Sequence, residues 1–143
     1  MRSGHMGESL TVQCFRNGEI AKFPRAIAWD IFEPYAHPAA FSGWDLSFPD
    51  GSRCHLHLDD DNEVDGFGIN RPCGSVFALV YSVLSKVPAI MIVSSDGFCC
   101  VADEKVLEGI PDWLRKALPV PVIVSSGPDI GSYFVSAEDL YGR

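Results

Sequence analysis

The chain has 143 residues, of which 47% are hydrophobic and 21% charged, a composition typical of a globular protein and not of a disordered one. Its formal net charge of -8 at pH 7, with 11 basic residues scattered along the chain, argues against direct binding to nucleic acid, which requires clustered Lys and Arg. No apolar run approaches the roughly 20 residues that span a bilayer, so no membrane span is expected.

The start of the chain indicates where the domain begins, and the cysteines indicate the redox compartment in which it folds. The first six residues, MRSGHM, are typical of a segment left by a cloning vector, so we predict a single globular domain over residues 7–143. The cysteines are odd in number and lack the spacing of a disulfide framework, which indicates free thiols in a reducing cytoplasm. They are Cys14, Cys54, Cys73, Cys99 and Cys100.

The first third of the chain predicts one strand and one helix. Leu10–Arg16 alternates and is rich in β-branched residues, so it predicts a strand that ends at the Asn17-Gly18 turn. From Pro24 onward the apolar residues recur at helical spacing, and proline is favoured in a first helical turn. We expect Pro34 to help end this helix.

Residues 44–59, WDLSFPDGSRCHLHLD, predict a β-hairpin around Asp50-Gly51. A two-residue loop would mix apolar and polar side chains on each face, whereas a three-residue loop over residues 50–52 separates them. The expected apolar pairs are Phe48 with Cys54, Leu46 with Leu56, and Trp44 with Leu58. The opposite face carries Asp45, Ser47, His55, His57 and Asp59, with Asp45 opposite His57.

The rest of the chain alternates between short apolar segments and turn signals. Strands are predicted at Val64–Asn70, Pro88–Ser94, Phe98–Ala102 and Val120–Val124, and helices at Ser75–Ser85, at Val106–Leu118 with a break near Gly109, and at about Asp129–Leu140. The expected order is β-α-β-β-β-α-β-β-α-β-α. This order predicts an α+β domain with a mostly antiparallel sheet and helices packed on it.

The hairpin strand offers one possible metal site. His55, His57 and Asp59 share a strand face, and two imidazoles with a carboxylate can bind a transition metal. The run H-L-H-L-D-D resembles the H-x-H-x-D-H motif of metallo-β-lactamase-fold hydrolases, but Asp60 replaces its last histidine and no histidine follows His57. The alternative is a solvated face of an amphipathic strand, and we expect no metal and no cofactor.

Cys73 offers a possible catalytic nucleophile. It lies just before the predicted helix Ser75–Ser85, and a helix N-terminus favours a thiolate. His55 or His57 could serve as its base, since the order of residues in the sequence does not restrict such pairs. The alternative is a buried cysteine that behaves as a small hydrophobic residue.

Because no catalytic constellation is complete, we predict a protein-binding domain without catalytic activity. Bacterial immunity proteins, which block a cognate toxin, are similar in size, acidity and lack of catalytic motif, and this analogy implies a basic protein partner. Acidic side chains steer such partners. The expected binding surface consists of Asp45, His57, Asp59, Asp60, Asp61, Glu63 and Asp65. A Cys73 enzyme and a His55, His57 and Asp59 metal site are the alternatives.

Overall fold

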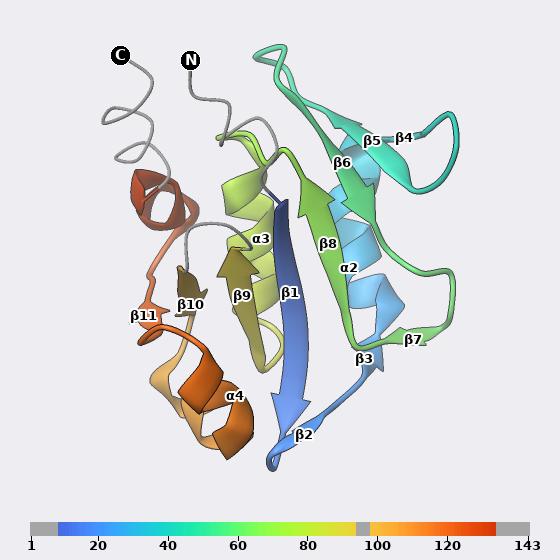
Figure 1. Cartoon of the computed structure of the whole chain (residues 1–143). Helices are drawn as coiled ribbons and strands as arrows, with labels where there is room; N and C mark the ends of the chain where they lie inside the picture. Colours follow the sequence, from blue (N-terminus) through green and yellow to red (C-terminus); the bar gives the residue numbers. More distant parts are fainter. Residues whose placement is uncertain (1–8, 94–97, 134–143) are drawn as a thin grey trace.

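A computed structural model describes residues 9–93 and 98–133. The chain forms a mixed, mostly antiparallel sheet with helices on both faces (Figure 1), which confirms the predicted α+β class. The vector-derived segment predicted at residues 1–6 lies outside the described residues, as does the end of the predicted last helix. In the described chain, residues 127–133 are helical.

The main sheet has the strand order β11-β10-β9-β1-β8-β6-β5-β4, and β2 pairs with the end of β1. A separate pair joins β3 to β7. The strands are β1 (Ser9–Arg16), β2 (Glu19–Ile20), β3 (Phe23–Pro24), β4 (Ala36–Pro38), β5 (Trp44–Ser47), β6 (Arg53–His57), β7 (Glu63–Val64), β8 (Gly66–Asn70), β9 (Ala89–Val93), β10 (Cys99–Val101) and β11 (Val122–Ile123). Every pair is antiparallel except β10 with β11.

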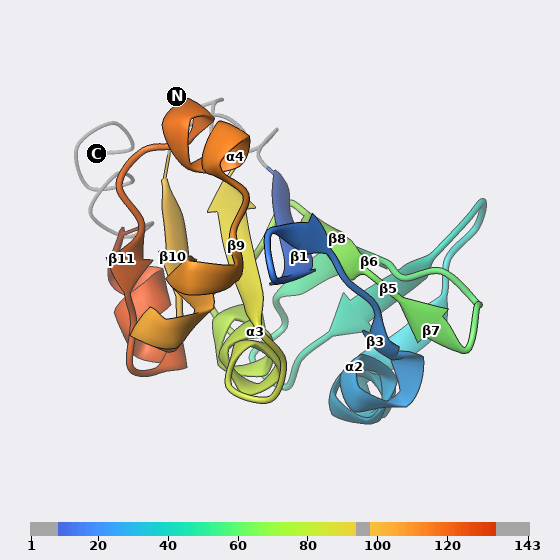
Figure 2. The ribbon, with the colours of Figure 1, turned by 90° about the horizontal axis from the view of Figure 1, so that it is seen from below.

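Two helices cover one face of the sheet, α2 (Arg25–Phe32) and α3 (Val76–Leu84). Figure 2 shows both on the same side of the strands. Pro24 precedes α2 in an extended conformation, so its missing N–H costs no helical hydrogen bond. The Phe32 ring meets Phe67 of β8 edge-on with centroids 5.2 Å apart, and burial of each ring stabilises the fold by roughly 1.5–3 kcal/mol.

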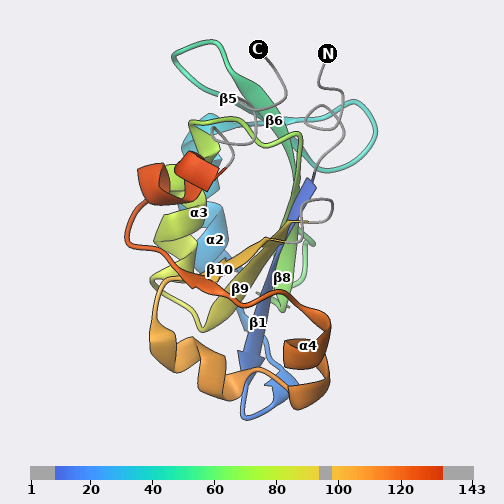
Figure 3. The same ribbon diagram turned by 60° about the vertical axis from the view of Figure 1, so that its left-hand side comes forward.

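Within residues 9–93 and 98–133, helical segments cover the opposite face over the half of the sheet near β9 and β10. There the 3₁₀ segment η2 (Glu104–Gly109) and α4 (Asp112–Ala117) pack over a second, smaller apolar cluster (Figure 3). This explains the apolar run AIMIV of β9, since Ala89 and Met91 face one cluster and Ile90 faces the other. The predicted break near Gly109 is confirmed, with α4 beginning after Pro111.

The hairpin has the predicted faces but a different register. Leu46 pairs with Cys54 and Asp45 pairs with His55, a shift of two residues from the predicted pairs. The loop has three residues, 49–51, because Pro49 begins the turn and the Gly51 N–H bonds to the Phe48 oxygen. Because the shift is even, no side chain changes face, but the prediction that Asp45 lies opposite His57 is wrong.

In residues 9–93 and 98–133, no helix has the length and apolar character needed to cross a bilayer.

Candidate functional site

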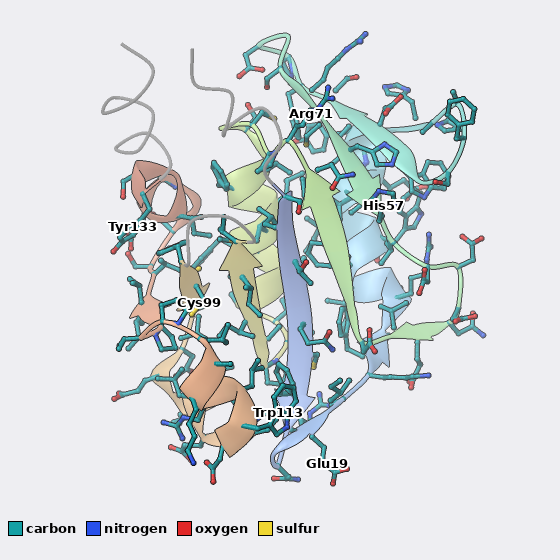
Figure 4. The ribbon with its side chains drawn as sticks, viewed as in Figure 1. Glu19, His57, Arg71, Cys99, Trp113 and Tyr133 are labelled. Carbon is teal, nitrogen blue, oxygen red and sulfur yellow. The ribbon has the colours of Figure 1, made fainter. Side chains whose placement is uncertain are left out.

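Strands β5, β6 and β8 are covered on one face by α2, and none of the described helices packs on their other face. Alternation places Leu56 of β6 in the core and directs His55 and His57 to the open side. Figure 4 shows His57 on this part of the sheet, in front of the fainter α2. The open face is therefore polar, as the sequence pattern predicts.

Each histidine on this face has a side-chain partner from a neighbouring strand. The His55 Nδ1 lies 3.2 Å from the Asp45 carboxylate, and the His57 Nε2 lies 3.1 Å from the Asn70 amide nitrogen. The two imidazole rings meet at 66° with centroids 4.4 Å apart. Among the residues that the structure describes, no three His, Cys, Asp or Glu side chains are placed to hold a metal ion, so the metal-site alternative gains no support from the geometry.

Five of the six predicted acidic side chains lie in residues 59–65, called the acidic loop below, whereas Asp45 lies on β5. All of its carboxylates are exposed, and the Asp60 side chain is 98% exposed. Arg25, at the start of α2, holds the loop from inside: its Nε donates to the Asp59 backbone oxygen at 2.6 Å and its N–H to the Asn62 oxygen at 2.9 Å. The loop backbone is therefore fixed while its carboxylates face solvent.

An aromatic stack extends from this anchor to the next loop along the surface. The Arg25 guanidinium lies 4.9 Å from the centre of the Trp29 ring, and that ring lies 4.7 Å from the Trp44 ring. We call Arg25, Trp29 and Trp44 the aromatic stack. Both tryptophans are only half-buried, which is typical of aromatic residues at protein interfaces.

Beside Trp44, the loop of residues 39–43 presents a fully exposed phenylalanine, Phe41, at 101%. The Ala39 N–H donates to the Gly43 oxygen at 3.2 Å and closes the loop. Single exposed apolar residues are common, so the interest of Phe41 lies in its place in the chain, three residues before Trp44. Phe41 and Trp44 were not predicted as surface residues, because apolar and aromatic types predict the core. The contacts of Arg25 join distant parts of the chain and carry no local signal in the sequence.

Cys73 and Cys54 meet at the other end of the hairpin. The side chain of Cys73 interacts with that of Cys54 and lies near the backbone N–H groups of Ser75 and Val76, and the Val76 N–H donates to the Cys73 backbone oxygen at 3.0 Å. These contacts, the Cys54 thiol above all, lower the pKa of Cys73 to about 6, although burial acts in the opposite direction. The same contact and burial raise the pKa of Cys54. The ionised form is therefore favoured on Cys73 and disfavoured on Cys54.

A hydrogen-bond network holds these cysteines beside each other. The Asp50 carboxylate accepts from the hydroxyls of Ser52 at 2.6 Å and Ser75 at 2.8 Å, which ties the hairpin tip to the start of α3. These bonds lower the pKa of Asp50, with the Ser52 hydroxyl as the largest cause. Ser52 also contributes to the lowered pKa of Cys73.

The histidines do not share this location. Cys54 and His55 are adjacent on β6 and so point to opposite faces of the sheet. The groups that affect the pKa of Cys73 are Cys54, Ser52 and the backbone N–H groups of Ser75 and Val76, with no histidine among them. The suggested pairing of Cys73 with a histidine base gains no support from these contacts.

A cleft of about 330 Å³ opens where the polar face meets the end of the hairpin. Figure 4 shows Arg71 directly after the end of β8. Both Arg71 and the preceding residue, Asn70, line the cleft. Its lining carries charges of both signs: Asp45, Arg53, Cys54, His55, Asn70 and Arg71.

Comparison of the chain with protein-family models, with curated proteins and with solved structures finds no match in any of the three.

Proposed function

We propose that this protein is a non-catalytic protein-binding domain that captures a basic protein partner with its acidic loop, in the manner of an immunity-type inhibitor of a bacterial toxin. The observation that carries the proposal is the anchoring of the acidic loop by Arg25, which fixes the backbone and leaves the carboxylates exposed. A surface that is ordered before binding loses less conformational entropy when a partner binds.

The charge of the chain supports a basic partner. A net charge of -8 attracts a basic protein, and carboxylates concentrated on one loop give that attraction a direction. Asp45 and His57 on the neighbouring open face extend the same surface. The contact between Arg25 and Asp60 is long, at 3.9 Å, and its carboxylate is 98% exposed, so the ion pair has a small energy and leaves Asp60 available to a partner.

The aromatic stack and Phe41 support a protein as the partner, in preference to a small cation. Binding energy at protein interfaces is concentrated in a few aromatic and arginine side chains surrounded by polar residues. Trp29, Trp44 and Phe41 supply such side chains, with the acidic loop as the polar border. The proposed occupant of this surface is therefore a basic protein with an apolar pocket for Phe41.

The experiment compares two triple variants with the same change in charge. D59N/D60N/D61N neutralises the acidic loop, and E104Q/E108Q/D112N neutralises exposed carboxylates on η2 and α4 at the other end of the molecule. The partner is isolated with the wild-type protein as bait and identified by mass spectrometry, and its Kd is measured for each variant. We expect the first variant alone to lose at least tenfold in affinity, with a steep dependence on salt.

Equal affinity for the two triple variants would remove the acidic loop from the proposal. F41A tests the aromatic contribution separately, and we expect an increase in its off-rate. The immunity-type role has its own readout, because co-expression of the wild-type protein must then restore the growth of cells that produce the partner.

The cysteine-enzyme alternative keeps one specific support, the lowered pKa of Cys73. Its direct test is turnover of acyl or thioester substrates by the wild-type protein and by C73S. A reaction that survives C73S would exclude Cys73 as the nucleophile.

A further inference from the structure

Two cysteines far apart in the chain are brought into reciprocal contact between β6 and the segment before α3. The side chains of Cys54 and Cys73 interact. The two segments also meet at the Ser75 hydroxyl, two residues after Cys73, which lies 3.4 Å from the hydroxyl of Ser52, two residues before Cys54. Cys54 is only 7% exposed, whereas Cys73 is half-buried and reachable from solvent. Cys73 is therefore the more accessible residue of the pair, and Cys54 is shielded from solvent.

The pair differs from the other three cysteines of the chain. Cys14, Cys99 and Cys100 are completely buried. Burial raises the pKa of each of these thiols and keeps them protonated at neutral pH. Since only the thiolate is nucleophilic, these three provide internal controls within the same folded chain.

We propose that Cys73 is an oxidation site for small hydroperoxides and that Cys54 resolves the oxidised form as an intramolecular disulfide. The proposal does not depend on the protein-binding function proposed above. It rests on the contact between the two sulfurs, on the difference in their exposure and on the fixed backbone that holds them.

The reaction has two balanced steps. In the first, the Cys73 thiolate attacks one peroxide oxygen, the O–O bond breaks, and the departing oxygen takes up a proton and leaves as water or an alcohol. Cys73 is then a sulfenic acid and the peroxide has been reduced by two electrons. In the second, the Cys54 sulfur attacks the Cys73 sulfur, the hydroxyl group leaves with the Cys54 proton as water, and the disulfide forms.

Local structure favours both steps. The helix N–H groups of Ser75 and Val76 stabilise the thiolate that starts the reaction. The hydrogen bonds of Asp50 to Ser52 and Ser75 keep the two chain segments together, so Cys54 needs only a local movement to reach an S–S distance of about 2 Å. A bulky oxidant would meet the half-buried Cys73 less readily than hydrogen peroxide.

The test treats the folded wild-type protein with hydrogen peroxide and maps its cysteine peptides by mass spectrometry without reduction. We expect a Cys54–Cys73 disulfide within each chain, reversed by dithiothreitol, with the other three cysteines unmodified. In C54A the resolving thiol is missing, so dimedone should trap the sulfenic acid at Cys73. The same experiment in 8 M urea should abolish the preference for this pair.

Oxidation spread evenly over the cysteines, a disulfide that links two chains, or a pair other than Cys54 and Cys73 would overturn the proposal. A preference that persists in urea would also overturn it, because the fold would then not be its cause. If C54A fails to fold, the wild-type peptide map and its urea control decide the question alone.

Discussion

The Nε of Arg25 donates a 2.6 Å hydrogen bond to the backbone oxygen of Asp59, 34 residues along the chain. This contact joins the start of α2 to the acidic loop, and the Arg25 side chain is 18% exposed. The loop conformation is therefore determined by a residue outside the loop, which makes the acidic surface sensitive to a substitution that changes none of its carboxylates.

Replacement of Arg25 by alanine is expected to destabilise the protein by about 1–3 kcal/mol, because it removes a charge-assisted hydrogen bond and the contact with Trp29. R25K retains the charge but lacks the planar guanidinium, so it should recover only part of this loss. Urea denaturation followed by tryptophan fluorescence measures both variants. A free energy of unfolding for R25A equal to that of the wild type would contradict the anchoring role.

The hairpin loop provides a matched pair of glycine substitutions. Gly51 has a φ of +89°, whereas Gly74 lies outside the positive φ region, and a Cβ added at either position meets no atom within 4 Å. G51A is therefore expected to cost about 1–2 kcal/mol from backbone strain alone, and G74A close to nothing. Thermal unfolding of the two variants side by side tests the turn, and equal melting temperatures would speak against the observed register.

Alkylation of Cys73 by iodoacetamide should follow the pKa of about 6 of this thiol, with half-maximal rate near pH 6. In C54A the largest cause of the lowered pKa is gone, so the midpoint should move up toward the ordinary value of 9.0. Rates are measured by peptide mapping between pH 5 and 10. A midpoint near 9 in both proteins would show that the contact with Cys54 has no effect on ionisation.

The same thiol makes stability depend on pH. A pKa that is lower in the folded chain than in the unfolded chain stabilises the fold above pH 9, and this contribution is lost as the pH falls through about 6. The difference in stability between the wild type and C73S should therefore grow from pH 6 to pH 9. Urea midpoints at these two values supply the comparison.

The Asp50 carboxylate makes the stability of the fold depend on pH in the acidic range. Its hydroxyl partners lower its pKa below the ordinary value of 3.8, so their contribution is present above pH 3.8 and disappears as the pH falls through the folded pKa. D50N should be less stable than the wild type at pH 7 and equally stable near pH 2. D30N, which neutralises an exposed carboxylate on α2, is the control with the same change in charge.

Periodicity predicted the longer elements, because alternating apolar residues dictate which face of a strand is buried. Cys54, Leu56 and Leu58 are all buried, as the pattern of the hairpin requires. The register depended on turn chemistry, and Pro49 as the first turn residue moved the loop by one position and its strand pairs by two.

Other features could not be predicted because they depend on contacts between distant residues. The two-residue strands β2, β3 and β7 are too short to show a period, and β3 and β7 exist through their mutual pairing. The meeting of Cys54 with Cys73 likewise depends on how the chain crosses the sheet. The local sequence indicated a helix N-terminus near Cys73, but it did not indicate that Cys54 lies beside Cys73.

The place of β1 at the centre of the sheet has a consequence for folding. Leu10 of this strand pairs with Ile69 of β8 on one side and with Val93 of β9 on the other. The backbone hydrogen bonds of β1 to β8 and β9 therefore cannot form until those two strands have been synthesised. Such a high contact order predicts slow folding on or after the ribosome. Until β9 emerges, an apolar strand with an unpaired edge is exposed to other chains, and aggregation competes with folding during synthesis.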